Sequence, residues 1–192
     1  MDVARVNFHP LIRRAPGAFL VFALGGISYQ SAFGQSRSET LSLGPVQVAG
    51  DEASYLDLGA GAFNIQATHQ APSTTEGRVE FRYGKKLFYI GPALGLLANR
   101  QGGVFGYGGV YADLRLGPVV MTPLGAIGGY RRGGSEDLGG VFQFRLSVTM
   151  SYEFGNRSRI GVQYAHISNA DVYTVNPGEN ELLLTFALPL PF

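Results

Sequence analysis

The chain has 192 residues, including 28 glycines, 10 tyrosines and 13 phenylalanines, but no cysteine or tryptophan. Its 15 basic and 14 acidic residues give a net charge of +1. Because neither sign is concentrated in one stretch, this balance argues against a nucleic-acid partner. The absence of cysteine excludes disulfides, thiol nucleophiles and Cys-ligated zinc, and glycine at this density disfavours a helical protein. Together these features predict a small, single-domain β protein.

The first 34 residues have the pattern of a secretory signal peptide. A start that carries three arginines is followed by an apolar run from Ala18 to Ile27, and small residues lead to Ala32-Phe33-Gly34. The apolar run is shorter than the roughly 20 residues that a membrane-spanning helix needs. We therefore expect residues 1–34 to be removed and the mature protein to lie outside the cytoplasm.

The next segment, residues 35–52, alternates apolar and polar residues but is broken in the middle. The break is Gly44-Pro45, and a proline cannot donate to a sheet ladder. The short stretches on either side of the break could pair with each other. We nevertheless predict that residues 35–52 are a periplasmic segment that leads into the barrel.

From residue 53 onward the chain divides into eight segments in which apolar and polar residues alternate. They are residues 55–67, 77–83, 87–99, 104–116, 119–131, 141–154, 159–168 and 181–192. Several exceed the roughly five or six residues of an ordinary strand and match or exceed the roughly 9–11 residues of a tilted membrane strand. The pattern predicts eight strands.

Alternation alone does not separate a soluble sandwich from a barrel whose apolar face meets lipid. Three further features favour the barrel. The connections tend to alternate between short and long, as periplasmic turns and outer loops do. An even number of strands puts both ends of the barrel on the periplasmic side. The last strand carries apolar residues on one face up to a terminal Phe192, which resembles the closing strand of outer-membrane barrels. Residues 53–192 are therefore predicted to be all-β, an eight-stranded antiparallel transmembrane β-barrel of the outer membrane.

The polar face of these strands is predicted to fill the barrel. Eight strands enclose an interior just wide enough for side chains, so the charges on this face indicate a lumenal network rather than a pore lining. The residues concerned are Glu80, Arg82, Asp113, Arg115, Arg145 and Glu153.

One polar pair lies on the opposite, lipid-facing side. Ile160, Val162 and Tyr164 define that face, and His166 and Ser168 continue its parity. Side chains two apart on a strand point the same way, and a hydroxyl beside an imidazole is the minimal activated nucleophile. The alternative is that both residues merely sit at the headgroup rim. A polar pair facing hydrocarbon costs free energy unless it is satisfied, so we expect it to have a function.

The sequence around this pair resembles a known family. His166-Ile167-Ser168-Asn169-Ala170, followed by Asn176-Pro177-Gly178 and a last strand, is similar to the PagL family of outer-membrane lipid A 3-O-deacylases. The resemblance extends in outline over residues 53–192, and its specific part is residues 164–186. It implies an eight-stranded barrel and an esterase that removes the acyl chain at position 3 of lipid A, with no metal or other cofactor.

The resemblance also implies roles for individual residues. Ser168 would be the nucleophile and His166 the general base. The acid that orients the histidine in the family falls here on Asn180, flanked by Glu179 and Glu181. Asn180 shares the outward parity of His166 and is the preferred choice, whereas Glu181 or Glu179 would need a shift of register. The oxyanion hole would be formed by Asn169 and the backbone near Ala170 and Asp171.

Two alternatives remain open at this stage. A non-catalytic barrel that serves adhesion or envelope integrity would use the same fold without His166 and Ser168. An outer-membrane phospholipase would use the same pair on another lipid. The expected partner is lipid A or lipopolysaccharide of the outer leaflet, and a homodimer is left open.

Overall fold

The structure is a computed structural model that describes residues 40–66 and 71–191. Over these residues its strands are joined by turns and loops, with no helix. The strands are β1 (Thr40–Leu43), β2 (Val46–Ala49), β3 (Ser54–Phe63), β4 (Thr74–Arg82), β5 (Gly91–Asn99), β6 (Val104–Tyr111), β7 (Leu114–Leu116), β8 (Val119–Arg131), β9 (Phe142–Glu153), β10 (Arg159–Ser168) and β11 (Glu179–Leu190). The predicted signal peptide, residues 1–34, lies outside the described residues and stays a prediction. No helix of the described part is long and apolar enough to cross a membrane.

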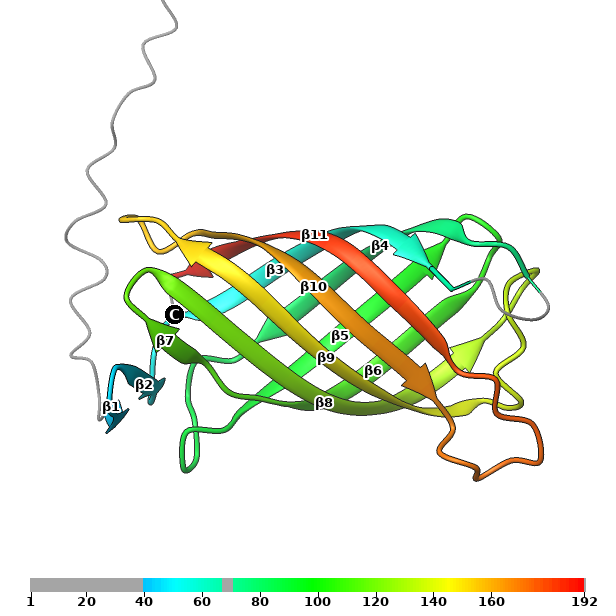
Figure 1. Cartoon of the computed structure of the whole chain (residues 1–192), viewed down its shortest axis with the longest axis horizontal. Coiled ribbons are helices and arrows are strands. Elements are labelled where there is room, and N and C mark those ends of the chain that lie inside the picture. Colours follow the sequence, from blue (N-terminus) through cyan, green and yellow to red (C-terminus); the bar gives the residue numbers. More distant parts are fainter. Residues whose placement is uncertain (1–39, 67–70, 192) are drawn as a thin grey trace, which may run out of the picture.

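Eight of the strands close into a barrel, as predicted. Neighbours in the sequence pair antiparallel from β3 to β6, β6 pairs with β8, and the order continues through β9, β10 and β11 back to β3. Figure 1 shows the tilted strands and, at the right-hand end, the longer connections that follow β8 and β10. The first barrel strand begins and the last one ends at the opposite end of the barrel. Long loops therefore lie at one end, and the start and end of the barrel lie at the other.

The faces of the strands are inverted relative to a soluble barrel. On β9, Leu146, Val148 and Met150 point outward and are 64%, 43% and 59% exposed, while Arg145, Ser147 and Thr149 between them are buried. Aromatic pairs lie near both ends of the outer surface, Phe142 with Phe144 and Tyr152 with Phe154. An apolar exterior bounded by aromatic residues is what a barrel in a lipid bilayer requires.

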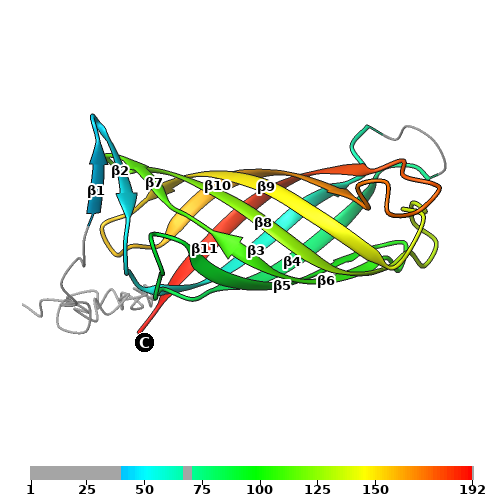
Figure 2. The same ribbon diagram turned by 90° about the horizontal axis from the view of Figure 1, so that it is seen from below.

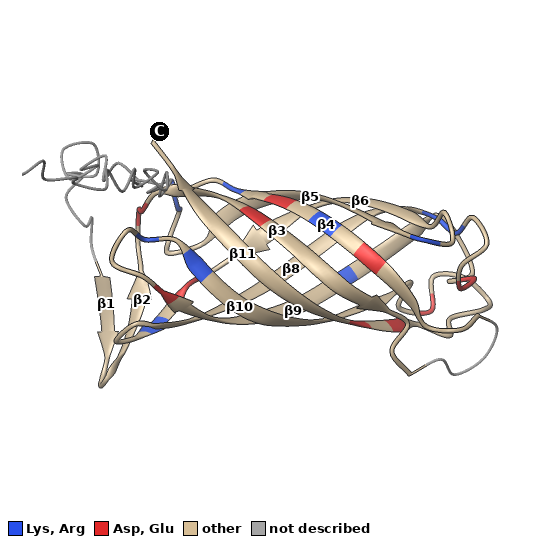
Figure 3. Cartoon of the chain, turned by 90° about the horizontal axis from the view of Figure 1, so that it is seen from above, with Lys and Arg blue, Asp and Glu red and all other residues tan. Residues whose placement is uncertain are grey.

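The interior is filled by the predicted charge network. Arg82 contacts Asp57 at 2.6 Å and Glu80 at 2.7 Å, and Arg78 contacts the same two carboxylates. Toward the end of the barrel where β3 begins and β11 ends, a second group joins Glu52, Lys86, Asp113, Arg115, Glu153 and Arg159. Figure 3 shows these charges distributed along the barrel. Because buried charges are tolerated only when paired, the network accounts for the polar face of the strands.

The segment predicted as a lead-in contains a hairpin. β1 pairs with β2 around Gly44, which has φ +63, and β2 pairs with β7 through Gln47 and Val48. Figure 2 shows the hairpin beside the end of the barrel where the C-terminus lies. Gly44-Pro45 therefore makes the turn of a hairpin, because the left-handed conformation of glycine occurs at the position that interrupts the alternation.

The predicted segment 104–116 is divided between β6 and β7. The interruption falls at Ala112 and Asp113, opposite Thr122 and Pro123 of β8 in the same register. Ala112 N–H donates to the Pro123 carbonyl at 3.2 Å, but proline has no N–H to return the bond. The carbonyl of the next residue, Asp113, accepts from Ala49 N–H at 2.9 Å. The local break thus provides the attachment point for the hairpin. The first predicted strand is also shorter, since β3 ends at Phe63.

Candidate functional site

The outward polar pair lies at the end of β10, where the long β10–β11 loop begins (Figure 1). The antiparallel register sets His166 directly opposite Asn180 of β11, and Ile167 opposite Glu179. Ile167 and Glu179 are buried in the interior, whereas His166, Ser168 and Asn180 are half-buried on the outer face. The parity expected from the sequence therefore holds at the site.

Asn180 is the centre of a hydrogen-bonded group on this outer face. Its Oδ1 lies 2.9 Å from Nδ1 of His166 and accepts a hydrogen bond from the Tyr164 hydroxyl at 2.8 Å. Its Nδ2 donates to Oε1 of Gln66 at 2.9 Å. The side chain that the sequence predicts as the orienting residue is thus in contact with Nδ1 of the imidazole.

The two alternative orienting residues are on the other side of the barrel wall. The Glu181 carboxylate forms an ion pair with Arg145, and both side chains are fully buried. The Glu179 carboxylate accepts a hydrogen bond from the backbone N–H of Asn64 at 3.1 Å. Because both carboxylates are engaged in the interior, neither is placed to hold His166.

Ser168 is two residues beyond His166 on the same face. The two alpha carbons are therefore separated by roughly 6.5–7 Å. No hydrogen bond joins Ser168 Oγ to the imidazole among the described residues, and in free enzymes such contacts are often long until substrate binds. On its other side the imidazole is close to Gly178, where an added Cβ would lie 2.9 Å from His166 Cε1. Gly178, with φ +64, therefore leaves the space that the edge of the imidazole ring needs.

The residues after Ser168 form a strained turn. Val172 N–H donates to the Asn169 carbonyl at 3.1 Å, and the two central residues, Ala170 and Asp171, have φ of 51° and 61°. Positive φ at both central positions is characteristic of a type I′ turn and costs roughly 1–2 kcal/mol for each residue other than glycine. The turn's own hydrogen bond leaves the two central N–H groups free, and neither has an acceptor among the described residues.

Asn169 itself does not fit the predicted oxyanion role in this geometry. The residue is fully buried, and its Nδ2 donates to the carbonyls of Leu138 and Val175, each at 2.7 Å. Its backbone N–H donates to Oδ1 of Asn176 at 3.0 Å. The bond to Leu138 joins the β10–β11 loop to the β8–β9 loop, and the other two bonds lie within the β10–β11 loop. All donors of this buried residue are therefore used, as a buried amide requires.

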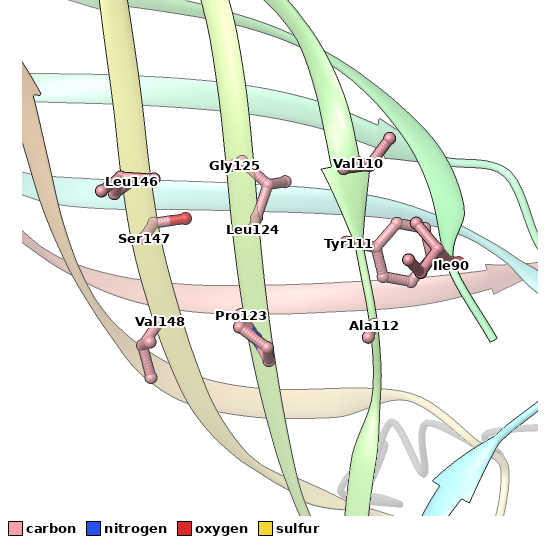
Figure 4. Close-up of a pocket in the computed structure, with 10 residues that line it drawn as sticks. All are labelled: Ile90, Val110, Tyr111, Ala112, Pro123, Leu124, Gly125, Leu146, Ser147 and Val148. Atoms are coloured by element: carbon pink, nitrogen blue, oxygen red, sulfur yellow. The ribbon is translucent and has the colours of Figure 1, made fainter. Parts of the chain in front are cut away.

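Two hollows on the outer surface lie away from this pair. One groove of about 420 Å³ opens between β6, β8 and β9. Figure 4 shows side chains from these three strands around it, with Val110, Pro123 and Leu146 among them. The lining is apolar and holds neither His166 nor Ser168. The described residues also contain no group of His, Asp and Glu side chains suited to a metal.

Sequence reasoning missed one residue of the site and undervalued another. Gln66 follows the end of β3 in the sequence, and only the pairing of β3 with β11 brings it beside Asn180. Tyr164 was recognised as outward-facing, and its spacing of two from His166 was the available signal for its contact with the site. No sequence pattern pointed to Gln66, since its place depends on how the barrel closes.

Comparisons with known proteins bear on the family and the fold of the chain. A family model described as "Lipid A 3-O-deacylase (PagL)" matches residues 23–189. The crystal structure of the outer membrane enzyme PagL has a TM-score of 0.52 and 17% identity, covering 71% of this chain and 99% of that chain. Neisserial surface protein A has a TM-score of 0.53 and 15% identity, covering 71% and 97%. A de novo designed transmembrane β-barrel has a TM-score of 0.51 and 11% identity, covering 74% and 99%.

At these identities the similarity to solved structures shows the fold alone. No curated protein matches the chain. The family model is the stronger finding, because it extends over most of the sequence and includes the last two strands. The chain belongs to the PagL family of lipid A 3-O-deacylases, which are carboxylic ester hydrolases of the outer membrane.

Proposed function

We propose that this protein removes the 3-O-linked acyl chain of lipid A with Ser168 as nucleophile, His166 as general base and Asn180 as the residue that orients the base. One observation carries the proposal: Asn180 Oδ1 lies 2.9 Å from His166 Nδ1 on the outer face of the barrel. That face meets the lipid, so a substrate anchored in the outer leaflet reaches the pair by lateral diffusion.

The first role of Asn180 is to select the tautomer of His166. With an amide oxygen as its neighbour, Nδ1 carries the proton and donates it to Asn180. The other nitrogen, Nε2, is then left with its lone pair free. This is the state that a general base needs, and an asparagine serves the same purpose in Cys-His-Asn enzymes.

The reaction then has two halves. Ser168 Oγ attacks the ester carbonyl carbon while His166 Nε2 takes the hydroxyl proton, and the carbonyl oxygen becomes an oxyanion. Collapse of this intermediate breaks the bond to the 3-oxygen of lipid A, which receives the proton from His166, and leaves the acyl chain on Ser168. Water, deprotonated by His166, then releases the fatty acid and restores the hydroxyl.

The oxyanion is assigned to the strained turn that follows the nucleophile. The N–H groups of Ala170 and Asp171 are not used by the turn's own hydrogen bond, and backbone donors in an oxyanion hole contribute about 10²–10³ in rate each. Strain in two residues other than glycine, next to the nucleophile, supports this assignment, since such strain concentrates at functional sites. The hydrogen bonds from the Asn169 side chain to the carbonyls of Leu138 and Val175 hold the turn in place.

The decisive experiment is mass spectrometry of lipid A from cells that express the protein. Loss of one hydroxyacyl chain is expected for the natural sequence and absence of that loss for Ser168→Ala and His166→Ala. Thr174→Ala, an exposed change in the same loop, is the matched control and should retain activity. A barrel that serves adhesion or envelope integrity would leave lipid A intact in every case, and that result would refute the proposal.

The phospholipase alternative is tested with the same purified variants. Release of fatty acid is compared between lipid A and phosphatidylethanolamine in mixed micelles. Preference for the phospholipid, abolished by Ser168→Ala, would keep the Ser/His mechanism and replace the substrate. The oligomeric state does not enter the mechanism, because every residue named belongs to one chain.

A further inference from the structure

An asparagine in the orienting position poses a chemical problem that a carboxylate does not. A carboxylate presents only acceptors to the imidazole, whereas an amide presents an oxygen on one side and an NH₂ group on the other. With the NH₂ group toward His166, Nδ1 would become the acceptor and the proton would move to Nε2. The base would then be lost. Replacing the triad Asp of a serine protease by Asn has this effect, since the wrong tautomer lowers kcat about 10⁴-fold.

The neighbours of Asn180 favour the productive orientation. Tyr164 donates its hydroxyl proton to Oδ1 at 2.8 Å, so the oxygen receives two donors, the phenol and the imidazole Nδ1–H. Gln66 Oε1 accepts from Nδ2 at 2.9 Å. In the reverse orientation the phenol oxygen would accept from the NH₂ group and the phenol proton would lose Oδ1 as its acceptor, which is costly at a surface that meets lipid.

Gln66 is held beside Asn180 by the backbone as well. The residues that follow β3 cross the start of β11, where Ile65 N–H donates to the Asn180 carbonyl at 3.0 Å. Asn64 N–H donates to the Glu179 carboxylate at 3.1 Å. Two consecutive backbone donors thus fix this corner of the β3–β4 loop to the strand that carries the orienting residue, and Gln66 comes next in the chain.

We propose that Gln66 and Tyr164 are positioning residues that hold the Asn180 amide with its oxygen toward His166, so that a neutral side chain keeps the catalytic tautomer. The proposal rests on the Ser/His mechanism above and goes beyond it by assigning the tautomer to two residues outside the triad. Neither residue touches the reacting atoms. Both act through Asn180.

The test uses the chemistry of position 66. Gln66→Glu makes this position acceptor-only, which locks Nδ2 toward it and Oδ1 toward the imidazole. Gln66→Lys makes it donor-only, which draws Oδ1 away and turns the NH₂ group toward Nδ1. We expect Gln66→Glu to retain kcat within about threefold, and Gln66→Lys to lower it at least tenfold with little change in KM. Tyr164→Phe should lower kcat in the same way but less.

Two comparisons separate this effect from charge and from folding. Thr174→Glu and Thr174→Lys place the same charges on an exposed residue of the neighbouring loop, and we expect their kcat values to agree within threefold. In Asn180→Asp the orienting side chain has no NH₂ group, so the difference between Glu and Lys at position 66 should disappear. Migration of unheated samples in gels confirms that each barrel is folded.

A second measurement does not depend on activity. In protein labelled with ¹⁵N-histidine in detergent micelles, the ring nitrogen shifts of His166, identified by comparison with His166→Ala, report which nitrogen carries the proton. Nδ1–H is expected in the natural sequence and in Gln66→Glu, and Nε2–H in Gln66→Lys. The inference is overturned if Ser168→Ala abolishes activity while the two variants at position 66 have equal kcat and the same tautomer, or if their difference persists in Asn180→Asp. Full activity in Ser168→Ala would instead overturn the proposed mechanism itself and the inference with it.

Discussion

Gly178 offers a direct test of how closely the position of His166 controls the rate. It has φ +64, and an added Cβ would lie 2.9 Å from His166 Cε1 and 3.4 Å from Nε2. Carbon atoms pack best at roughly 3.5–4.0 Å, so Gly178→Ala must displace the ring or the loop by roughly 0.6–1 Å. A misplacement of about 1 Å at a catalytic group costs on the order of 10²-fold in rate.

The substitution also strains the backbone, and a second glycine separates the two effects. Gly117 has φ +59 in the turn between β7 and β8, and an added Cβ there meets nothing within 4 Å. Both alanine variants should lose about 1–2 kcal/mol of stability from the left-handed backbone. Only Gly178→Ala should lose activity, by about 10- to 100-fold in kcat.

The assay is the rate of fatty acid release from lipid A in micelles, with urea unfolding of both variants as the measure of stability. Comparable losses of stability with a large difference in kcat are the expected result. Equal kcat in Gly178→Ala and Gly117→Ala would refute the view that Gly178 sets the position of the imidazole, because the steric conflict would then have been relieved without moving it.

Three further predictions concern the interior and the loops. Arg145→Met should destabilise the barrel by about 3–5 kcal/mol in urea unfolding, because it leaves the Glu181 carboxylate buried without its partner. Adding Glu181→Leu should recover most of this stability, and a double variant no more stable than Arg145→Met would contradict the pairing. Asn169→Asp should make the β10–β11 loop more sensitive to proteases than Asn169→Ala does, since it sets a carboxylate against two carbonyl oxygens. Equal rates of cleavage in the two variants would contradict the role of the Asn169 side chain in holding the loop. The Gly139 N–H, and then Arg132, lower the pKa of the Asp137 carboxyl in the β8–β9 loop below its ordinary value of 3.8. A lowered folded-state pKa contributes stability above the unfolded value that is lost as the pH falls through the folded value. The loop should therefore keep this contact at pH 5–7, and an NMR titration midpoint at or above 3.8 would be the contrary result.

The sequence was sufficient for the architecture because period-two alternation specifies which side chains share a face. A slip of one residue would move every side chain of a strand to the opposite face. A long alternating segment such as 141–154 therefore allows only one assignment of side chains to faces, and β9 covers Phe142–Glu153 of it. The same parity placed His166, Ser168 and Asn180 together on the outside before any fold was known. The hairpin of β1 and β2 was not predicted, since its attachment depends on the pairing of β2 with β7, a contact between segments far apart in the sequence.

The site shows the limit of the same reasoning. Parity assigns a face but not a register, so Asn180 and Glu181 could be ranked by face alone, and the contact with His166 follows from the pairing of β10 with β11. The inward turn of Asn169 depends on carbonyls from Leu138 and Val175 in two different loops. Gln66 reaches Asn180 only because the first and last strands of the barrel meet. The sequence by itself determined the faces, the number of strands in the barrel and the family, because these follow from local alternation and motif. Only the tertiary structure decided which polar atoms meet at the outer end, because barrel closure brings together residues that lie far apart in the chain.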